Sequence, residues 1–537
     1  MNSAANNRCF TALVALVVAL GGFVWGFDAT VISGAVPFLQ TYFHLTGDRG
    51  DWLLGLAVSC LGWGVLGGTA VAGVLSDRFG RKKILVLTAL LFVGSSLLSA
   101  LTTNFSVFVA ARILGGLAVG GAILIAPVYI AEIAPPSKRG GMVSLNQLMI
   151  VLGISASFFS NYFLLQKGAN NWRWMLGMDA VPAALYFVLL FFVPESPRWL
   201  FGRGEVSLAR SILAKTAGEE GLEAELKSIQ ASFSAPRQHA PWRELFSGRM
   251  RFVVFIALGI AFFQQITGIN AIFYYLPTIF AQAGGGANAA FKQAILVGLV
   301  NLGMTFVAIW LVDRLGRKPL LLIGSLGMTV SLLACSMAFH SATYHLGDRS
   351  IQVFRENKVP EETLQKLSKA PRVEFKTEKQ YLAAIEAQAG ADTVKAYRSA
   401  LVTGGLNIRA GAVLCAIIGF VASFAISLGP VMWLLLSEIF PNTHRGVGIS
   451  LAGFWNSAIS AGVTLIFPWE LSHWGAAGTF LGYGVLAALA FLFVAAFIPE
   501  TRRKSLEELE RLLIRPAAAT ITTQEPQISN ELREPIA

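Results

Sequence analysis

The amino-acid sequence predicts an all-α membrane protein whose twelve transmembrane helices form two related six-helix bundles. Of its 537 residues, 55% are hydrophobic and only 14% are charged, whereas about 25% of the residues of a typical soluble protein are charged. Twelve apolar stretches are long enough to cross a bilayer, which takes about 20 residues per helix. Motifs of the first half of the chain recur in the second half, so we expect the two bundles to be related by duplication.

The apolar stretches locate the expected helices. In the first half they lie near residues 11–33, 53–74, 84–102, 107–130, 142–165 and 174–193. In the second half they lie near residues 252–281, 291–312, 319–340, 410–437, 447–469 and 475–498. The first stretch contains Asp28 and has neither a basic leader nor a small-residue cleavage site. We therefore expect a retained helix rather than a cleaved signal peptide.

Basic residues predict the orientation of the helices. The net charge of +11 could indicate nucleic-acid binding, but most Lys and Arg residues flank apolar stretches, where they meet lipid headgroups. The five short loops on one side, with their immediate flanks, carry only Arg49, Lys167, Arg173 and Lys292. By the positive-inside rule these loops lie outside and both termini are cytoplasmic. The long loop 341–409 is also expected outside, because long loops cross the membrane largely regardless of charge.

Three pairs of motifs indicate the duplication. "GVLSDRFGRKK" (73–83) recurs as "WLVDRLGRKPL" (310–320), "AEIAPPSKRGG" (131–141) as "SEIFPNTHRGV" (437–447), and "PESPRWL" (194–200) as "PETRRKS" (499–505). Such halves are typical of alternating-access carriers, which bind their substrate between the halves. The expected organisation is a bundle over 1–196, a cytoplasmic helical linker over 197–250, a bundle over 251–515 with an insert at 341–409, and a disordered tail over 516–537.

The motifs also carry a family resemblance. Together with "QQITGINAIFYY" (264–275), "GPVMWLLLSEIFP" (429–441) and "PETRRKSLEELE" (499–510), they resemble the sugar porter family of the major facilitator superfamily. The resemblance covers both halves and nearly every helix. It implies the major facilitator fold, with a sugar pocket between the two bundles and cytoplasmic helices after the sixth span. Within the family, the chain resembles bacterial proton-coupled xylose symporters.

Asp28 lies deep inside the first apolar stretch, where an ionised carboxylate costs several kcal/mol unless it is paired or protonated. Arg112 is the only basic residue inside the fourth stretch and can serve as its partner. A conformational change that separates the pair would make Asp28 take up a proton, so we interpret the pair as a proton-coupling device. The alternative is a static ion pair that holds two helices together. The resemblance favours coupling, because xylose symporters carry this Asp and Arg, whereas mammalian facilitative glucose carriers have Asn in place of the Asp.

Amide side chains are the candidate sugar ligands. Gln264, Gln265 and Asn270 lie on a seventh helix that Gly268 and Pro277 weaken. A carboxamide both donates and accepts hydrogen bonds, as a sugar hydroxyl does, although amides also join helices inside membranes. The resemblance implies sugar binding or gating by these residues and by Gln147, Asn301, Trp433, Asn456, Phe424, Tyr274 and Tyr275.

Two positions depart from the family pattern. Ser457 stands where family members often have Trp, and Trp455 is about 200° away around the helix, so it cannot replace that side chain. Ile154 stands where the xylose symporters have a second Gln. These departures leave open which sugar is carried. The expected class is a neutral monosaccharide, a pentose or a hexose such as xylose or glucose.

Charged residues recur at the cytoplasmic helix ends. The resemblance implies that they form ion pairs that lock the outward-facing state, whereas the alternative is a set of solvated loop charges. They are Asp77, Arg81, Glu132, Arg139, Glu195, Arg198, Asp313, Arg317, Glu438, Arg445 and Glu500.

The predicted function is proton-coupled symport of a sugar across the cell inner membrane, by a monomer without a cofactor other than the transported proton. The alternatives are a facilitative uniporter and, less favoured, a transporter-like sugar sensor. No enzyme is expected, because the sequence has no nucleophile elbow or Walker loop, and its Cys and His residues have no metal-binding spacing. The insert 341–409 carries eleven basic and eight acidic residues. Its helical patterns predict a small cap outside the membrane, or simply a tolerated surface insertion.

Overall fold

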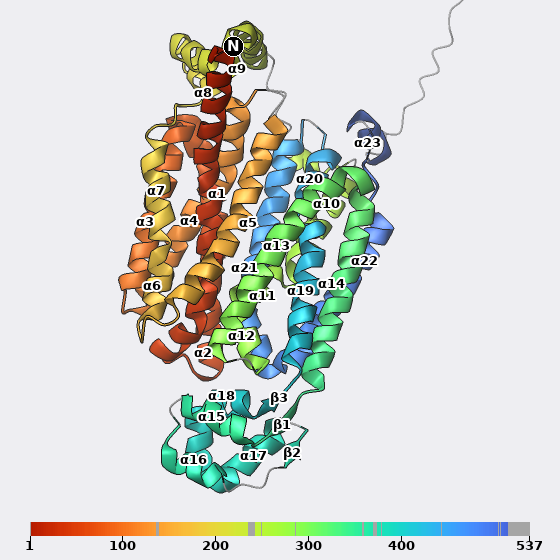
Figure 1. Cartoon of the computed structure of the whole chain (residues 1–537). Coiled ribbons are helices and arrows are strands. Elements are labelled where there is room, and N and C mark those ends of the chain that lie inside the picture. The colour runs from red at the N-terminus through yellow and green to blue at the C-terminus, as the bar shows by residue number, and fades with distance from the viewer. Residues whose placement is uncertain are drawn as a thin grey trace, which may run out of the picture.

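The computed structural model describes residues 2–135, 139–234, 242–248, 250–284, 286–356, 359–368, 373–376, 378–441, 443–502, 504 and 506–513. Within this part of the chain, twelve helices are long and apolar enough to span a membrane, so the predicted number is confirmed. Figure 1 shows them side by side, with α8 (Pro197–Gly202), α9 (Val206–Ser234) and α23 (Leu506–Leu513) at one end of the bundle and the insert at the other. We call these ends the α9 side and the insert side. The predicted tail 516–537 lies outside the described residues.

The first half contains six spans. They are α1 (Asn2–Tyr42), α2 (Gly47–Phe79), α3 (Arg81–Leu101), α4 (Phe105–Ile133), α5 (Arg139–Leu164), and α6 (Asn171–Met178) with α7 (Ala180–Leu190). α1 continues well beyond its predicted end at residue 33, although Pro37 lies inside it. A proline is tolerated there because neighbouring helices can satisfy the backbone groups that it frees.

The second half repeats the arrangement with two broken spans. After the short 3-10 helix Trp242–Phe246 come α10 (Arg251–Ile266), α11 (Ile269–Tyr274), α12 (Leu276–Gln282), α13 (Ala287–Leu315), α14 (Arg317–His340), α19 (Ala410–Ile426), α20 (Leu428–Ile439), α21 (Arg445–His473) and α22 (Gly475–Phe497). The seventh span breaks at Gly268, which has a left-handed φ of 87° that favours glycine, as its sequence indicates. The tenth span breaks at Ser427. Broken helices expose backbone groups that can contact a substrate.

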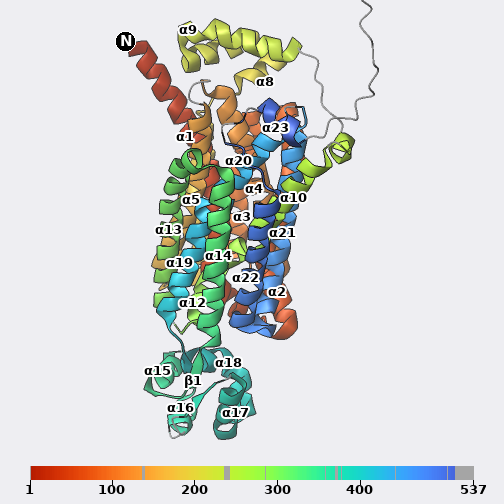
Figure 2. The ribbon, with the colours of Figure 1, turned by 90° about the vertical axis from the view of Figure 1, so that its right-hand side faces the viewer.

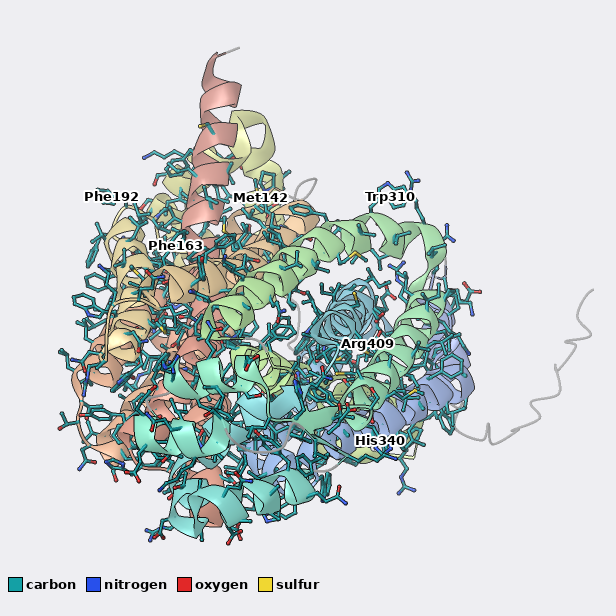
Figure 3. The ribbon with its side chains drawn as sticks, turned by 60° about the horizontal axis from the view of Figure 1, so that its bottom comes forward. Met142, Phe163, Phe192, Trp310, His340 and Arg409 are labelled. Carbon is teal, nitrogen blue, oxygen red and sulfur yellow. The ribbon has the colours of Figure 1, made fainter. Side chains whose placement is uncertain are left out.

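The outer faces of the bundle are apolar, as a lipid environment requires. Phe192 is 79% exposed and Trp310 is 56% exposed. Figure 3 shows both side chains pointing away from the bundle. Large apolar side chains with this exposure would be unfavourable in water, so the structure independently supports a membrane location.

The two halves are in contact toward the insert side. One apolar cluster contains Val31 and Leu54 of the first half together with Phe273 and Phe467 of the second. The crossing of α2 and α21 is so close that a Cβ atom at Gly55 would lie 1.9 Å from the backbone oxygen of Leu465. We call the contact between α2 and α21 the α2–α21 seam. The buried residues of a separate cluster nearer the α9 side, in contrast, all belong to the first half.

Gly55→Val is expected to slow transport on the order of tenfold, equivalent to about 1.4 kcal/mol, because the branched side chain obstructs the α2–α21 seam. Gly303→Val is the matched control, since it adds the same side chain to a span where no heavy atom lies within 4 Å of the new Cβ. Initial uptake rates in vesicles with equal amounts of each variant provide the measurement. Equal rates for both variants would show that the seam does not have to close during transport.

The insert is a small domain with its own core. Its helices are α15 (Asp348–Glu356), α16 (Glu361–Ser368), α17 (Glu378–Ala389) and α18 (Ala391–Gly405), and its strands are β1 (Thr343–His345), β2 (Glu374–Phe375) and β3 (Leu406–Asn407). The predicted helices are confirmed, whereas the antiparallel sheet β2-β1-β3 was not expected. Phe354, Leu364 and Tyr381 are buried in a cluster separate from those of the bundles. Burial also raises the pKa of the Tyr381 phenol, whose hydroxyl donates to the Leu401 carbonyl at 3.0 Å.

Replacing residues 346–404 with a short Gly/Ser linker should leave a folded carrier that still binds sugar. Tyr344 pairs with Leu406 across β1 and β3, so the two ends of the insert already lie together and a short loop can join them. We expect the transport rate to change more than the affinity for sugar. Size-exclusion chromatography and calorimetry on the shortened protein test this expectation. A monodisperse product that cannot bind sugar would mean that the insert supplies part of the site.

Candidate functional site

A buried ion pair connects α1 and α4 in the first half. Asp28 is 2% exposed and Arg112 is 1% exposed. The Nη1 group of Arg112 donates to Asp28 Oδ1, and its Nη2 group donates to the Asp28 backbone oxygen at 3.1 Å. Asp28 Oδ2 has no hydrogen-bond partner in the described part of the chain. The structure thus brings together the two residues that the sequence paired.

A second buried carboxylate, which the sequence interpretation missed, lies beside this pair. Asp179 is 1% exposed at the junction of α6 and α7, and the Ser96 hydroxyl donates to its Oδ2 at 2.6 Å. It lies within electrostatic reach of both Asp28 and Arg112. The signal was an acidic residue inside the apolar stretch 174–193, which is as unusual there as Asp28 is in its own stretch. Two carboxylates and one guanidinium leave one negative charge uncompensated if all three are ionised.

Four predicted sugar ligands form one hydrogen-bonded network in the second half. The Asn456 amide donates to Gln264 Oε1 at 2.7 Å, and the Gln265 amide donates to Asn456 Oδ1 at 3.1 Å. The Asn270 amide donates to Gln265 Oε1 at 2.9 Å and to Ser460 Oγ at 2.7 Å. We call these five residues the amide network. It connects α10, α11 and α21, so both roles considered for the amides, joining helices and binding sugar, remain compatible with the geometry.

The amide network also connects the two broken spans. Gln264 Nε2 donates to the backbone oxygen of Leu428 at 2.9 Å, directly after the break of the tenth span at Ser427. Gly268, at the break of the seventh span, packs on the ring of Tyr483. The network therefore lies at the irregular backbone of both broken spans.

The other predicted pocket residues make no direct hydrogen bonds to the network among the described residues. Asn301 is buried on α13, Phe424 is partly buried on α19, and Gln147 is exposed on α5. Trp433, on α20, is 42% exposed. Trp455, beside the buried Asn456, is 40% exposed.

Tyr274 and Tyr275 lie at the end of α11 and contact both halves. Tyr274 packs against the cores of both halves and lies within electrostatic reach of Asp28 and Arg112. Tyr275 is 1% exposed, with its ring centroid 5.0 Å from that of Phe467. The helix that carries Asn270 therefore lies beside the buried ion pair of the opposite half.

The charged motifs form the same cluster in each half on the α9 side. In the first half Arg81 pairs with Asp77 at 2.8 Å and with Glu132 at 3.3 Å. Glu195 Oε1 accepts hydrogen bonds from the backbone N–H groups of Arg81 and Lys82 at 3.0 and 3.1 Å. A carboxylate stabilises the start of α3 in this position because it faces unpaired N–H groups and the positive end of the helix dipole.

In the second half Arg317 pairs with Glu438 at 2.8 Å and with Asp313 at 3.6 Å. Glu500 accepts hydrogen bonds from the backbone N–H groups of Arg317 and Lys318, both at 3.1 Å. These pairs stay within one half. Their predicted role in locking the outward-facing state remains a prediction.

Three further polar residues at these clusters were missed. The Ser196 hydroxyl donates to Glu132 at 2.5 Å, and the Thr501 hydroxyl donates to Glu438 at 2.6 Å. They follow Glu195 and Glu500 in the third repeated motif, so the repeat itself was the available signal. Glu225 of α9 lies 3.4 Å from Arg139 and 3.8 Å from Arg198. No repeat marks it.

Arg445 begins α21, and its Nε and Nη2 groups have no hydrogen-bond partner in the described part of the chain. It is the predicted gate residue that the structure does not bring to a carboxylate. Arg139 and Arg198 are joined to α9 rather than to the other half.

Comparisons with known proteins agree with this architecture. The family model described as "Sugar (and other) transporter" matches residues 14–350 and 394–513. The chain belongs to the sugar porter family of the major facilitator superfamily. It is 35% identical to the arabinose-proton symporter of Bacillus subtilis (strain 168), over 94% of this chain and 96% of that protein. It is 32% identical to the D-xylose-proton symporter of Escherichia coli (strain K12), with the same coverage.

A solved structure shares the fold. The inward open conformation of the xylose transporter XylE from E. coli matches with a TM-score of 0.71 and 31% identity, over 93% of this chain and 99% of that chain. The predicted family and the predicted fold of this sugar porter are thereby confirmed. The protein is a multi-pass membrane transporter rather than an enzyme. The family model omits residues 351–393, all of which belong to the insert.

Proposed function

We propose that this sugar porter carries out proton-coupled symport of a neutral monosaccharide, a pentose or a hexose, by alternating access in a cell inner membrane. The observation that carries the proposal is the buried cluster of Asp28, Arg112 and Asp179. An intramembrane carboxylate beside a second carboxylate and one guanidinium is suited to bind and release a proton. When all three groups are ionised, one negative charge is left uncompensated away from water. Relatives named as proton symporters of arabinose and xylose support the same function.

The proposed orientation places the α9 side in the cytoplasm. The N-terminal end of α1 and the helix α23 lie on that side, and Figure 2 shows α9 extending across it. The concentration of basic residues in the loops there favours a cytoplasmic location. The closed α2–α21 seam on the opposite side supports an inward-facing state, in keeping with the inward open relative.

In the proposed cycle, a proton from the insert side neutralises Asp28, and a sugar binds at the amide network. The halves then rock, and both solutes leave on the α9 side. Tyr274 gives a physical route for coupling, because α11 carries both Tyr274 near Asp28 and Asn270 in the network. We further propose that Gln147 and Trp433 face the sugar from the two halves, and that the charged clusters on the α9 side stabilise the helix ends that move.

The energetics are sufficient for accumulation. A membrane potential of 100 mV supplies about 2.3 kcal/mol per charge, and one pH unit supplies about 1.4 kcal/mol. With one proton per sugar, these sum to about 3.7 kcal/mol, or roughly 500-fold accumulation.

Addition of sugar to lightly buffered, de-energised cells that express the protein tests the proposal. A symporter should make the medium more alkaline as protons enter with the sugar. Saturable uptake without alkalinisation would instead identify a uniporter, and binding without uptake would identify a sensor. Competition by unlabelled monosaccharides against one labelled sugar then identifies the substrate.

A further inference from the structure

Three metal-ligating side chains meet across the α2–α21 seam on the insert side. Asp48 and Asp51 lie at the start of α2, and His473 is the last residue of α21. One carboxylate oxygen of each Asp and one imidazole nitrogen all lie within 4.8 Å of one another. The chain separation between α2 and α21 explains why sequence spacing could not indicate this group. The first half supplies two ligands and the second half supplies one.

The orientation of the His473 ring leaves one of its nitrogens facing Asp48. Its Nδ1 atom lies 3.0 Å from the backbone oxygen of Trp469, which can only accept a hydrogen bond, so Nδ1 carries the hydrogen. Nδ1 also lies 3.0 Å from the Ser472 hydroxyl, which donates to Asp51 at 2.5 Å. Nε2 is therefore the nitrogen that faces Asp48 Oδ1, 3.6 Å away. A neutral ring turns the Nε2 lone pair toward the carboxylate, so that a metal ion can join the two, whereas a protonated ring would pair with Asp48 directly.

We propose that Asp48, Asp51 and His473 bind one divalent transition-metal ion of the zinc type across the α2–α21 seam. Zinc bonds to imidazole nitrogen and carboxylate oxygen are about 2.0 to 2.2 Å long and tetrahedrally arranged, so the ligand atoms around an ion lie about 3.3 to 3.6 Å apart. Side-chain rotation must therefore bring the ligand atoms, which lie within 4.8 Å of one another, roughly 1 Å closer. The Asp48 side chain is 81% exposed and free to move. A backbone carbonyl on the other ring nitrogen is the usual outer partner of a metal-bound histidine.

The surroundings orient His473 and fix the distance between α2 and α21. The Trp469 ring stacks on the His473 ring with centroids 4.5 Å apart, and it lies 6.5 Å from the ring of Trp52 on α2. The close crossing at Gly55 and Leu465 fixes the spacing of the two helices. The site is complete only while the seam is closed, so a bound ion favours the state that is closed on the insert side. This effect rests on the proposed function. In alternating access the seam has to reopen for each sugar, so a bound ion slows reopening and inhibits uptake.

Calorimetric titration of zinc chloride into the purified full-length protein, with excess magnesium present, tests the site. We expect one saturable zinc site that binds at least tenfold more weakly in His473→Gln and in Asp48→Asn. His340→Gln and Asp392→Asn are matched controls and should bind as the wild type does. His340 also ends a span on the insert side (Figure 3), and Asp392 is also an exposed acid in the first turn of a helix. Unchanged binding in His473→Gln would overturn the site, and no sugar is needed for the result.

Vesicle uptake tests the effect on closure. Zinc added on the insert side should inhibit uptake by the wild type and by His340→Gln, a chelator should reverse the inhibition, and His473→Gln should resist it. Equal inhibition of His473→Gln would overturn the proposed effect of the ion on the seam. A protein that binds zinc but shows no proton coupling would overturn only the proposed function.

Discussion

Asp28→Asn is expected to abolish uphill accumulation, reducing it from roughly 500-fold to equilibration, while leaving sugar binding nearly unchanged. Asparagine keeps the shape of the side chain but cannot carry the transported proton. Asp28 is buried and lies in the first half, whereas the amide network lies in the second, so the substitution leaves the sugar ligands in place. The measurement is the steady-state ratio of labelled sugar across energised vesicles.

Counterflow provides the control for this variant. Vesicles preloaded with unlabelled sugar should still exchange it for labelled sugar, because exchange needs the pocket and the rocking motion but no net proton movement. If Asp28→Asn still accumulates sugar in response to a proton gradient, Asp28 is not the coupling residue.

Substitution of Arg112 distinguishes a proton-coupling pair from a static ion pair. Arg112→Ala leaves Asp28 buried without its partner, which costs about 3 to 5 kcal/mol when one member of a buried pair is removed. If the pair is purely structural, Asp28→Asn and Arg112→Ala should both reduce transport in proportion to their loss of thermal stability. If the pair couples proton movement to transport, Asp28→Asn should lose accumulation but retain stability and exchange.

The spans could be predicted from the sequence because a bilayer imposes one rule. Every backbone polar group in lipid must be satisfied within the protein, so long apolar stretches have to be helices. The break at Gly268 was visible for the same reason, since a flexible glycine marks a weak point in such a helix. The continuation of α1 past Pro37 was not visible, because the neighbouring helices that tolerate the proline are remote in the sequence.

The parts that were missed depend on contacts between distant segments. The strands of the insert have only two or three residues each, too few for an alternating pattern to be recognised. Asp179 could have been noticed as an acid in an apolar stretch, but its position beside Asp28 depends on how α6 and α7 pack. Nothing in a single sequence brings His473 to Asp48.

The residue types of the amide network could be named from the resemblance, but their partners could not. Gln264 donates to the backbone at the break of the tenth span, whereas Gln147 is exposed on α5. Removing the Gln264 side chain and removing the Gln147 side chain should therefore have different consequences. Comparing the two variants separates a loss of sugar binding from a loss of helix contacts.

Gln147→Ala, Gln264→Ala and Asn270→Ala should each weaken sugar binding by about 1 to 3 kcal/mol, because a buried sugar hydroxyl then lacks a partner. Gln264→Ala should also lower thermal stability, since the Leu428 carbonyl and the Asn456 amide lose a partner. Gln147→Ala should not, because its side chain is exposed without sugar. Gln40→Ala, at an exposed position on another span of the first half, is the matched control and should change neither quantity. Calorimetry and thermal unfolding on purified protein measure both effects. Unchanged affinity in all three variants, with stability lost in Gln264→Ala alone, would establish the network as a helix contact and place the sugar elsewhere.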